Sequence, residues 1–228
     1  FEACRIAKVK PRKIILASSR AVYGEGLYIN QSGEVVEACS RSSAVMAKGD
    51  FAVYGQLGDK LIPRPTPETL PPKPDSVYAS SKLMQELLVK NLATNFGWSI
   101  LRFQNVYGPG QSLTNPYTGV LSIFCSQIKS SKTLEIYEDG EIYRDFVYVD
   151  DVVSALVHAI KAPPGHILNI GSGSSFSILE VAKTLLCIAK SAGYSSNYRV
   201  TGKFRDGDIR YAQADIDKAE TLLGWKPT

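Results

Sequence analysis

A tyrosine and a lysine stand four residues apart in the segment Tyr78-Ala-Ser-Ser-Lys82. If this segment is helical, the two side chains lie one turn apart on the same face. A nearby ammonium favours the phenolate form of a tyrosine, and a phenol in that setting can take up and return a proton at neutral pH. The spacing therefore predicts a proton-transfer pair. Taken alone, an exposed tyrosine and lysine on an amphipathic helix is the alternative interpretation.

The flanking sequence predicts the elements that position this pair. A serine or aspartate at 75–76 can cap a helix from Val77 to about Thr94. The apolar run 13–17 predicts a central strand of a parallel sheet, and residues 98–103 predict the strand that follows the helix. Strand, helix and strand in this order are typical of a βαβ unit, so the predicted fold class is α/β. The first strand delivers Ser18 and Ser19 to the carboxyl edge of the sheet, where open α/β sheets bind ligands.

The composition excludes several classes of protein. The 228 residues are 44% hydrophobic and 21% charged, which is enough apolar material for a folded core. The net charge of +4 is spread along the chain without a basic segment interleaved with aromatic residues, so no nucleic-acid partner is predicted. No apolar run approaches the roughly 18 residues of a membrane span. Four widely spaced cysteines predict reduced thiols in a cytoplasmic protein, and no residues have metal-ligand spacing.

Several motifs occur in an order that resembles one family. They are Ser18-Ser-Arg-Ala-Val-Tyr-Gly24, Tyr78-x-x-x-Lys82, Leu101-Arg-Phe-Gln-Asn-Val-Tyr-Gly-Pro109, Arg144-Asp-Phe-Val-Tyr-Val-Asp150 and Arg205-Asp-Gly-Asp208. Together they resemble the extended short-chain dehydrogenases that act on nucleotide sugars, the NAD-dependent epimerase/dehydratase family. The resemblance implies a Rossmann-like parallel sheet, incomplete at its N-terminal half, with a smaller C-terminal substrate-binding domain. Residues 1–110, with a long inserted loop at about 25–65, are expected to be the remaining NAD-binding part. Residues 111–228 are expected to be mainly substrate domain, returning to the first sheet in places.

The resemblance also implies a role for each residue that matches a motif. The catalytic residues it implies are Ser19, Tyr78 and Lys82. The cofactor contacts it implies are Ser18, Tyr78, Lys82 and Gln104, and the substrate contacts are Ser19, Asn105, Arg144, Arg205 and Asp208. Guanidinium groups bind phosphate oxygens in a bidentate way, which suits the two arginines to a diphosphate. Surface salt bridges from these arginines to Asp145 or Asp206 are the alternative.

A glycine-rich turn at Gly171-Ser-Gly173 follows a predicted strand, as a dinucleotide fingerprint does. Phe176 stands where that fingerprint requires a small residue, so we interpret the segment as a turn of the substrate half. No glycine-rich phosphate loop occurs before Ser19, although hydride transfer requires NAD or NADP. We therefore expect a cofactor-binding part upstream of Phe1, and expect these 228 residues alone to bind cofactor weakly and to be inactive.

Three reactions of the resembled family compete: 4-epimerisation, 4,6-dehydration and reduction of a keto sugar. The 4,6-dehydratases carry Asp-Glu after the hydroxyl residue, whereas this chain has Arg20-Ala21. That difference favours a 4-epimerase that works through a 4-keto sugar and NAD, with NADP as an open alternative. The expected substrate is a dTDP- or UDP-hexose, including 6-deoxyhexoses, and the expected assembly is a homodimer without a membrane partner. The alternative to an enzyme is a non-catalytic protein that keeps the fold for binding or dimerisation.

Overall fold

A computed structural model describes residues 1–93, 96–113 and 119–228. The helices are α1 Glu2–Ile6, α2 Ser43–Met46, α3 Val77–Leu92, α4 Val120–Lys129, α5 Val149–Lys161, α6 Ile178–Ser191 and α7 Asp217–Leu223, with a 3₁₀ turn, η1, at Arg20–Tyr23. The strands are β1 Lys13–Ser19, β2 Leu27–Ile29, β3 Ile62–Arg64, β4 Gly97–Phe103, β5 Asn105–Tyr107, β6 Leu134–Ile136, β7 Tyr143–Arg144, β8 Phe146–Tyr148, β9 His166–Ile170, β10 Phe176–Ser177 and β11 Tyr198–Val200.

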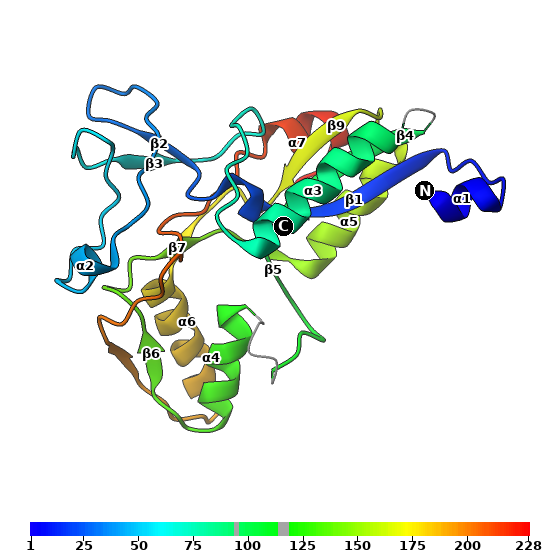
Figure 1. Ribbon diagram of the computed structural model, residues 1–228. Helices are drawn as coiled ribbons and strands as arrows, with labels where there is room; N and C mark the ends of the chain where they lie inside the picture. Colours follow the sequence, from blue (N-terminus) through cyan, green and yellow to red (C-terminus); the bar gives the residue numbers. More distant parts are fainter. Residues whose placement is uncertain (94–95, 114–118) are drawn as a thin grey trace.

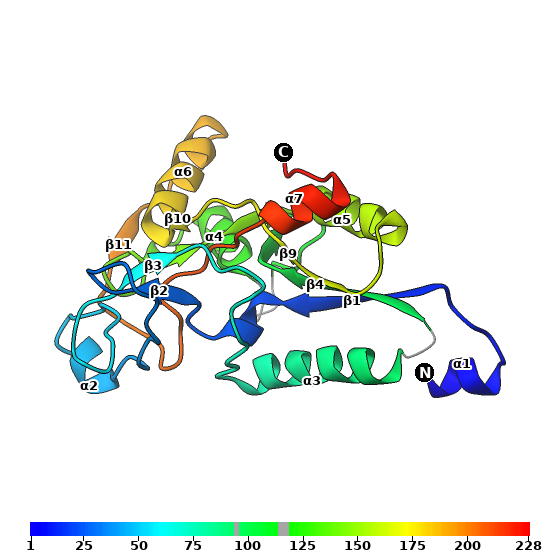
Figure 2. The same ribbon diagram turned by 90° about the horizontal axis from the view of Figure 1, so that it is seen from above.

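Three parallel strands form the main sheet in the order β1-β4-β9. Helix α3 covers one face of this sheet, and α5 and α7 cover the other (Figure 2). The predicted α/β class with a Rossmann-like parallel sheet is therefore confirmed. Among the described residues β4 lies between β1 and β9, so the central position predicted for residues 13–17 stays a prediction for the complete sheet. An apolar run shows that a strand is buried on its faces, and does not show which strands pair with its edges.

Helix α3 begins where the sequence predicts. The hydroxyl of Ser76 accepts the N–H of Ala79 at 3.1 Å, so Ser76 is the cap. The helix ends at Leu92, and the predicted end near Thr94 lies outside the described residues. The position of α3 along the sheet determines where Tyr78 and Lys82, on its first turns, lie.

A buried ionic cluster joins α3 to the sheet. Glu86 of α3 is fully buried and receives a bidentate pair from Arg102 of β4, with Nε and Nη2 at 2.9 and 2.7 Å. Ser18 of β1 donates its hydroxyl to Oε1 of the same carboxylate at 2.5 Å. Charge-assisted bidentate bonds of this kind fix geometry as well as contributing energy. The cluster therefore holds the helix at one position and one rotation on β1 and β4.

A second group of elements forms a lobe beside the sheet, with α4 and α6 packed on β6 and β11 (Figure 1). Its core contains Phe124, Ile128, Leu134, Ile136, Ile142 and Ile178. Helix α6 opens with a reciprocal capping box between Ser177 and Glu180. Strand β9 is part of the main sheet, and α7 packs against it. The chain after residue 111 therefore contributes to both cores. The boundary at residue 110 stays a prediction.

Residues 25–65, called the insertion below, form an ordered unit. Strands β2 and β3 pair antiparallel, and Tyr28, Val53 and Leu61 make a small core of their own. The sequence shows no periodicity here because the three core residues come from segments with little regular structure. The predicted insertion therefore has a folded structure of its own. Its side facing the lobe contacts residues next to the candidate site, as described below.

Two features are absent from the described residues, a membrane-spanning helix and a metal-binding cluster. Within them, no helix is both long and apolar enough to cross a membrane. The same part of the chain holds no group of three or more acidic, histidine or cysteine side chains arranged for a metal ion. Cys4, Cys39, Cys125 and Cys187 are all free thiols.

Candidate active site

Tyr78 and Lys82 lie on the same face of α3, as their spacing predicts. The Lys82 ammonium is 6.0 Å from the centre of the Tyr78 ring. It also donates to the carbonyl of Ala17 at 3.0 Å, which ties the lysine to the end of β1. Tyr78 is 55% exposed, so its phenol is accessible to a ligand. The structure thus brings the two residues together at the carboxyl edge of the sheet.

The two predicted serines at the end of β1 have different surroundings. Ser19 lines a cavity, and its Oγ accepts the N–H of Ala21 at 3.2 Å, which leaves the hydroxyl proton available for another acceptor. The hydroxyl of Ser18 is buried and is used by Glu86. The cofactor contact predicted for Ser18 stays a prediction, and only for its main chain.

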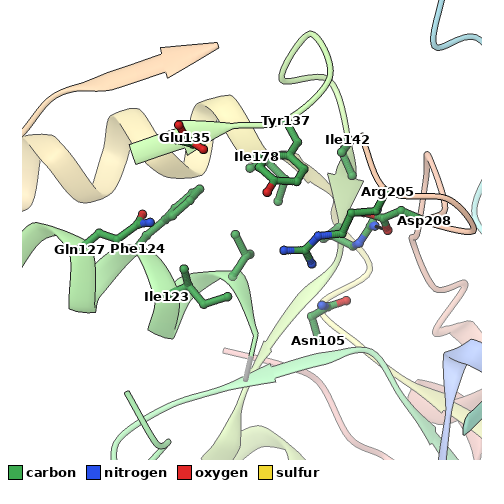
Figure 3. Close-up of a pocket in the computed structure, with 12 residues that line it drawn as sticks. Asn105, Ile123, Phe124, Gln127, Glu135, Tyr137, Ile142, Ile178, Arg205 and Asp208 are labelled. Carbon is green, nitrogen blue, oxygen red and sulfur yellow. Dashed lines mark hydrogen bonds and ion pairs between the residues drawn. The ribbon is translucent and has the colours of Figure 1, made fainter. Parts of the chain in front are cut away.

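The larger of two neighbouring cavities has a volume of about 480 Å³ and lies between the lobe and the edge of the sheet. Apolar side chains of α4 and α6 and the ring of Tyr137 form its walls. Figure 3 shows Phe124, Gln127 and Glu135 at one end, and Asn105, Arg205 and Asp208 at the other. The end at α4 therefore combines apolar side chains with the amide of Gln127 and the carboxylate of Glu135, and the other end is polar and charged.

The smaller cavity has a volume of about 320 Å³ and reaches the end of β1, where Ser19 and Arg20 line it. Asn105, Arg144 and Asp208 line both cavities. The two cavities therefore meet at these three side chains. One elongated ligand can extend from α4, past the arginines, to Ser19.

Strand pairing places the two polar residues that follow β4. The N–H of Gln104 donates to the carbonyl of Ile170, and the N–H of Asn105 donates to the carbonyl of Asp145. Strand β5 then pairs with β8 and not with the main sheet. Its first residue, Asn105, lines both cavities. Gln104 is only 6% exposed and lines the smaller cavity.

Arg144 and Arg205 both line the larger cavity, and neither forms the salt bridge considered as the alternative. Arg144 donates to Asp208 at 2.6 Å rather than to Asp145. Burial lowers the pKa of Arg144, and Asp208 opposes that effect. The guanidinium of Arg205 lies 5.2 Å from the centre of the Tyr137 ring. Arg144 thus lies where the two cavities meet, and Arg205 lines the larger cavity only.

Sequence reasoning missed the residues that fix the segment 205–208. Arg41 of the insertion donates to the buried carboxylate of Glu138 at 2.8 Å and also to the carbonyl of Asp208. Arg210 donates to the other oxygen of Glu138 at 2.6 Å. Arg41 has no motif or helical spacing that would have indicated this contact. The insertion therefore supports the wall of the site from outside.

The turn at Gly171-Ser-Gly173 holds a carboxylate of the protein. Asp145 accepts the N–H groups of Ser172 and Gly173, and a Cβ at Gly171 would lie 2.5 Å from its Oδ2. Burial raises the pKa of Asp145, and these backbone N–H groups oppose that effect. The turn is thus filled by Asp145, in agreement with the interpretation that it is not a dinucleotide site.

Comparisons with curated proteins agree with the motifs. A sequence model of the NAD dependent epimerase/dehydratase family matches residues 29–171. The dTDP-L-rhamnose 4-epimerase of Burkholderia thailandensis is 42% identical over 221 residues, which is 94% of this chain and 58% of that protein. The chain therefore spans less than two thirds of the length of this relative.

Solved structures agree with the fold. The structure of UDP-glucose 4-epimerase with UDP-glucose from Thermotoga maritima has a TM-score of 0.73 at 30% identity, covering all of this chain and 61% of that one. UDP-glucuronic acid 4-epimerase from Bacillus cereus, solved with UDP-glucuronic acid and NAD, has a TM-score of 0.70 at 28% identity and is covered to 59%. With more than half of its residues matched by the family's sequence model, the chain belongs to the NAD-dependent epimerase/dehydratase family.

Proposed function

We propose that this protein is a nucleotide-sugar 4-epimerase that works with NAD through a 4-keto sugar. The observation that carries the proposal is the pair of cavities that meet at Asn105, Arg144 and Asp208. Their surfaces follow one another as apolar side chains with an amide, then guanidinium groups, then a hydroxyl, which matches a nucleoside, a diphosphate and a sugar. The likeness to 4-epimerases in sequence and in structure supports the same assignment.

The described residues fit one part of the cofactor. An ammonium has three donors, and Lys82 gives one of them to Ala17, so two are available for ribose hydroxyl groups. Lys82 and the exposed Tyr78 stand at the carboxyl edge of the parallel sheet, where such sheets bind nucleotides. NAD, when bound, supplies the hydride acceptor that no side chain can provide. NADP, which accepts a hydride in the same way, is the alternative to NAD.

Tyr78 is the proton carrier in this proposal. Its phenol oxygen takes the proton of the sugar hydroxyl at C4 as the carbonyl forms and returns it as the carbonyl is reduced. Ser19 donates its hydroxyl to the same sugar oxygen and so keeps C4 in place. Nothing in this sequence of steps needs a second acid or base, which agrees with Arg20-Ala21 after Ser19, where the dehydratases carry Asp-Glu.

The arginines hold the nucleotide while the sugar turns. Arg144 and Arg205 present guanidinium groups to the diphosphate, and Asn105 and Asp208 complete that part of the site. At the end formed by α4, Gln127 has a buried Oε1 without a hydrogen-bond partner in the described residues. This acceptor suits an N–H of a pyrimidine base. A firm hold on the nucleotide leaves the sugar free to present either face to the hydride.

The substrate test uses the native full-length protein, NAD and two nucleotide sugars, dTDP-L-rhamnose and UDP-glucose. Formation of the C4 epimer is followed by proton NMR. We expect turnover of at least one, with the dTDP-6-deoxyhexose preferred because of the 42% identity to a dTDP-L-rhamnose 4-epimerase. Release of water to a 4-keto-6-deoxy sugar instead, or no change of either sugar, contradicts the proposal.

We also infer a cytoplasmic homodimer. Four free thiols suit a reducing compartment. Helix α3 exposes Met84, Leu87, Leu88 and Leu92, each between 47% and 59%, on a surface that a second copy can cover. Analytical ultracentrifugation of the full-length protein is expected to give a dimer, and Leu88→Glu is expected to give more monomer. A monomeric wild type contradicts the dimer and leaves the assigned reaction intact.

A further inference from the structure

Arg20 is a buried arginine whose Nε has no hydrogen-bond partner among the described residues. It follows Ser19 directly, opens η1 and is only 8% exposed. Its Nε lacks a hydrogen-bond partner, and no residue that the structure describes forms a hydrogen bond or ion pair with the guanidinium. Burial lowers the pKa of Arg20 to about 10, and Arg144 acts in the same direction, whereas Glu25 and Asp75 oppose this shift from a distance.

An arrangement of this kind is costly for a protein without ligand. A guanidinium carries five N–H donors, and burying a charge without hydrogen bonds is strongly unfavourable. The other buried arginine beside the sheet, Arg102, has a carboxylate partner in Glu86, and only its Nη1 lacks a hydrogen bond within the described residues. Arg20 therefore has the character of a group that waits for an acceptor from outside the chain.

A second unpaired group lines the same cavity. Gln104 is 6% exposed, and its Oε1 has no hydrogen-bond partner in the described part of the chain. Arg20 and Gln104 both line the smaller cavity, together with Ser19 and Asn105. An unpaired donor and an unpaired acceptor beside one cavity match a ligand that has both, which is what the hydroxyl groups of a sugar supply.

We propose that Arg20 is a specificity-determining contact to the sugar, donating to an oxygen substituent other than the reacting one at C4, while Gln104 accepts a sugar hydroxyl. This inference rests on the proposed function and extends it to the sugar itself. Ser19 takes the C4 oxygen, so its chain neighbour Arg20 reaches an oxygen on another carbon of the same ring. Substrates that lack that oxygen leave the buried guanidinium unpaired and are rejected.

The test measures kcat/KM of the full-length protein with the parent nucleotide sugar and with analogues deoxygenated singly at C2, C3 or C6 where the parent carries that hydroxyl. Wild type is expected to lose about 10- to 100-fold with one analogue, and Arg20→Met a similar factor with the parent sugar. In Arg20→Met, that same analogue is expected to lower kcat/KM by less than about threefold further, because the variant and the analogue remove the same contact. Arg20→Lys is expected to recover part of the discrimination.

Two further measurements separate this role from a structural one. Affinity for the nucleoside diphosphate without sugar is expected to stay within about twofold in Arg20→Met, since Arg144 and Arg205 are unchanged. The thermal unfolding midpoint of Arg20→Met is expected to equal or exceed that of wild type, because an unpaired buried charge is gone. Arg102→Met, which removes a paired arginine, is the matched control and is expected to lower the midpoint.

The outcomes distinguish the two proposals. If wild type turns over nucleotide sugars but every analogue loses the same factor in wild type and Arg20→Met, the role of Arg20 is refuted and the 4-epimerase assignment stands. A midpoint that falls in Arg20→Met as it does in Arg102→Met, with unchanged discrimination, makes Arg20 a structural residue. A wild type that neither turns over nucleotide sugars nor binds the nucleoside diphosphate refutes both proposals.

Discussion

Arg144 donates from Nη2 to Oδ1 of Asp208 at 2.6 Å, at the place where the two cavities meet. The carbonyl of Asp208 in turn accepts from Arg41 of the insertion. The same aspartate thus orients Arg144, the arginine that we propose to contact the diphosphate, and is itself held by a segment distant in the sequence. This chain of contacts links the insertion to the site.

Removal of the Arg144 guanidinium is expected to weaken nucleotide binding. Hydrogen bonds to charged groups contribute about 1.5–3 kcal/mol, so Arg144→Ala should lower affinity for the nucleoside diphosphate about 10- to 100-fold, measured by calorimetry. Arg144→Lys should recover little, because an ammonium lacks the planar fork. Lys226→Ala, which removes an exposed ion pair with Glu220, is the control and should leave affinity unchanged. Equal affinities in wild type and Arg144→Ala would place the diphosphate elsewhere.

The phenol of Tyr78 is expected to be required for turnover and dispensable for binding. Tyr78→Phe keeps the ring and loses the proton carrier, so kcat should fall about 10²- to 10⁴-fold. Affinity for the nucleotide sugar should change little, because the phenol is 55% exposed and the arginines hold the nucleotide. Turnover at the wild-type rate in Tyr78→Phe, in a protein with unchanged circular dichroism, would remove tyrosine from the mechanism.

The buried cluster under α3 is expected to dominate the local stability. Glu86→Ala leaves the 2% exposed Arg102 without its partner, and breaking a buried pair from one side costs about 3–5 kcal/mol. The double variant Glu86→Leu with Arg102→Met should be more stable than Glu86→Ala, because no charge is left unpaired. Urea unfolding measures both, with the exposed Lys90→Ala on the same helix as the control. A small effect of Glu86→Ala would show that α3 is held mainly by its apolar contacts.

Acid is expected to weaken the contact of Arg210 with Asp139. Burial acts to raise the pKa of Asp139, but hydrogen bonds from Arg210 and from the N–H of Glu141 outweigh it and hold that pKa below its ordinary value. A lowered carboxyl pKa stabilises the fold above the ordinary value, about 3.9, and this contribution is lost as pH falls through the folded-state pKa. The difference in free energy of unfolding between wild type and Arg210→Met should therefore be constant above about pH 5 and shrink below about pH 3.9. A difference that stays constant in acid would show that the carboxylate is not the stabilising partner.

Local patterns predicted the elements around Tyr78 because each carries its own signal. The apolar run of β1, the cap at Ser76 and the leucines of α3 all follow from short-range rules. Partners that meet only in the folded chain have no such signal. The pair of Glu86 and Arg102 is an example, since a helix glutamate and a strand arginine are each ordinary in their segments.

The candidate site, like the fold, is only partly predictable from the sequence. Motif order indicates Ser19, Tyr78, Lys82, Arg144 and Arg205. In the structure Ser19, Arg144 and Arg205 line the two cavities, whereas Tyr78 and Lys82 lie together on α3 by the end of β1 and line neither cavity. Arg20 stood inside one of these motifs and was interpreted only as a departure from dehydratases. Its burial without a partner is a property of the folded chain, and sequence has no equivalent of that observation.

The most direct test of the central claim follows hydrogen at C4 of the sugar. The full-length protein is incubated with NAD and dTDP-L-rhamnose or UDP-glucose in D₂O, and the products are examined by NMR. Because the hydride leaves C4 and returns to it while Tyr78 moves only the hydroxyl proton, the C4 epimer should carry no solvent deuterium on carbon. Deuterium at C3, C5 or C6, or a product that has lost water, would contradict a 4-epimerase acting through transient oxidation at C4.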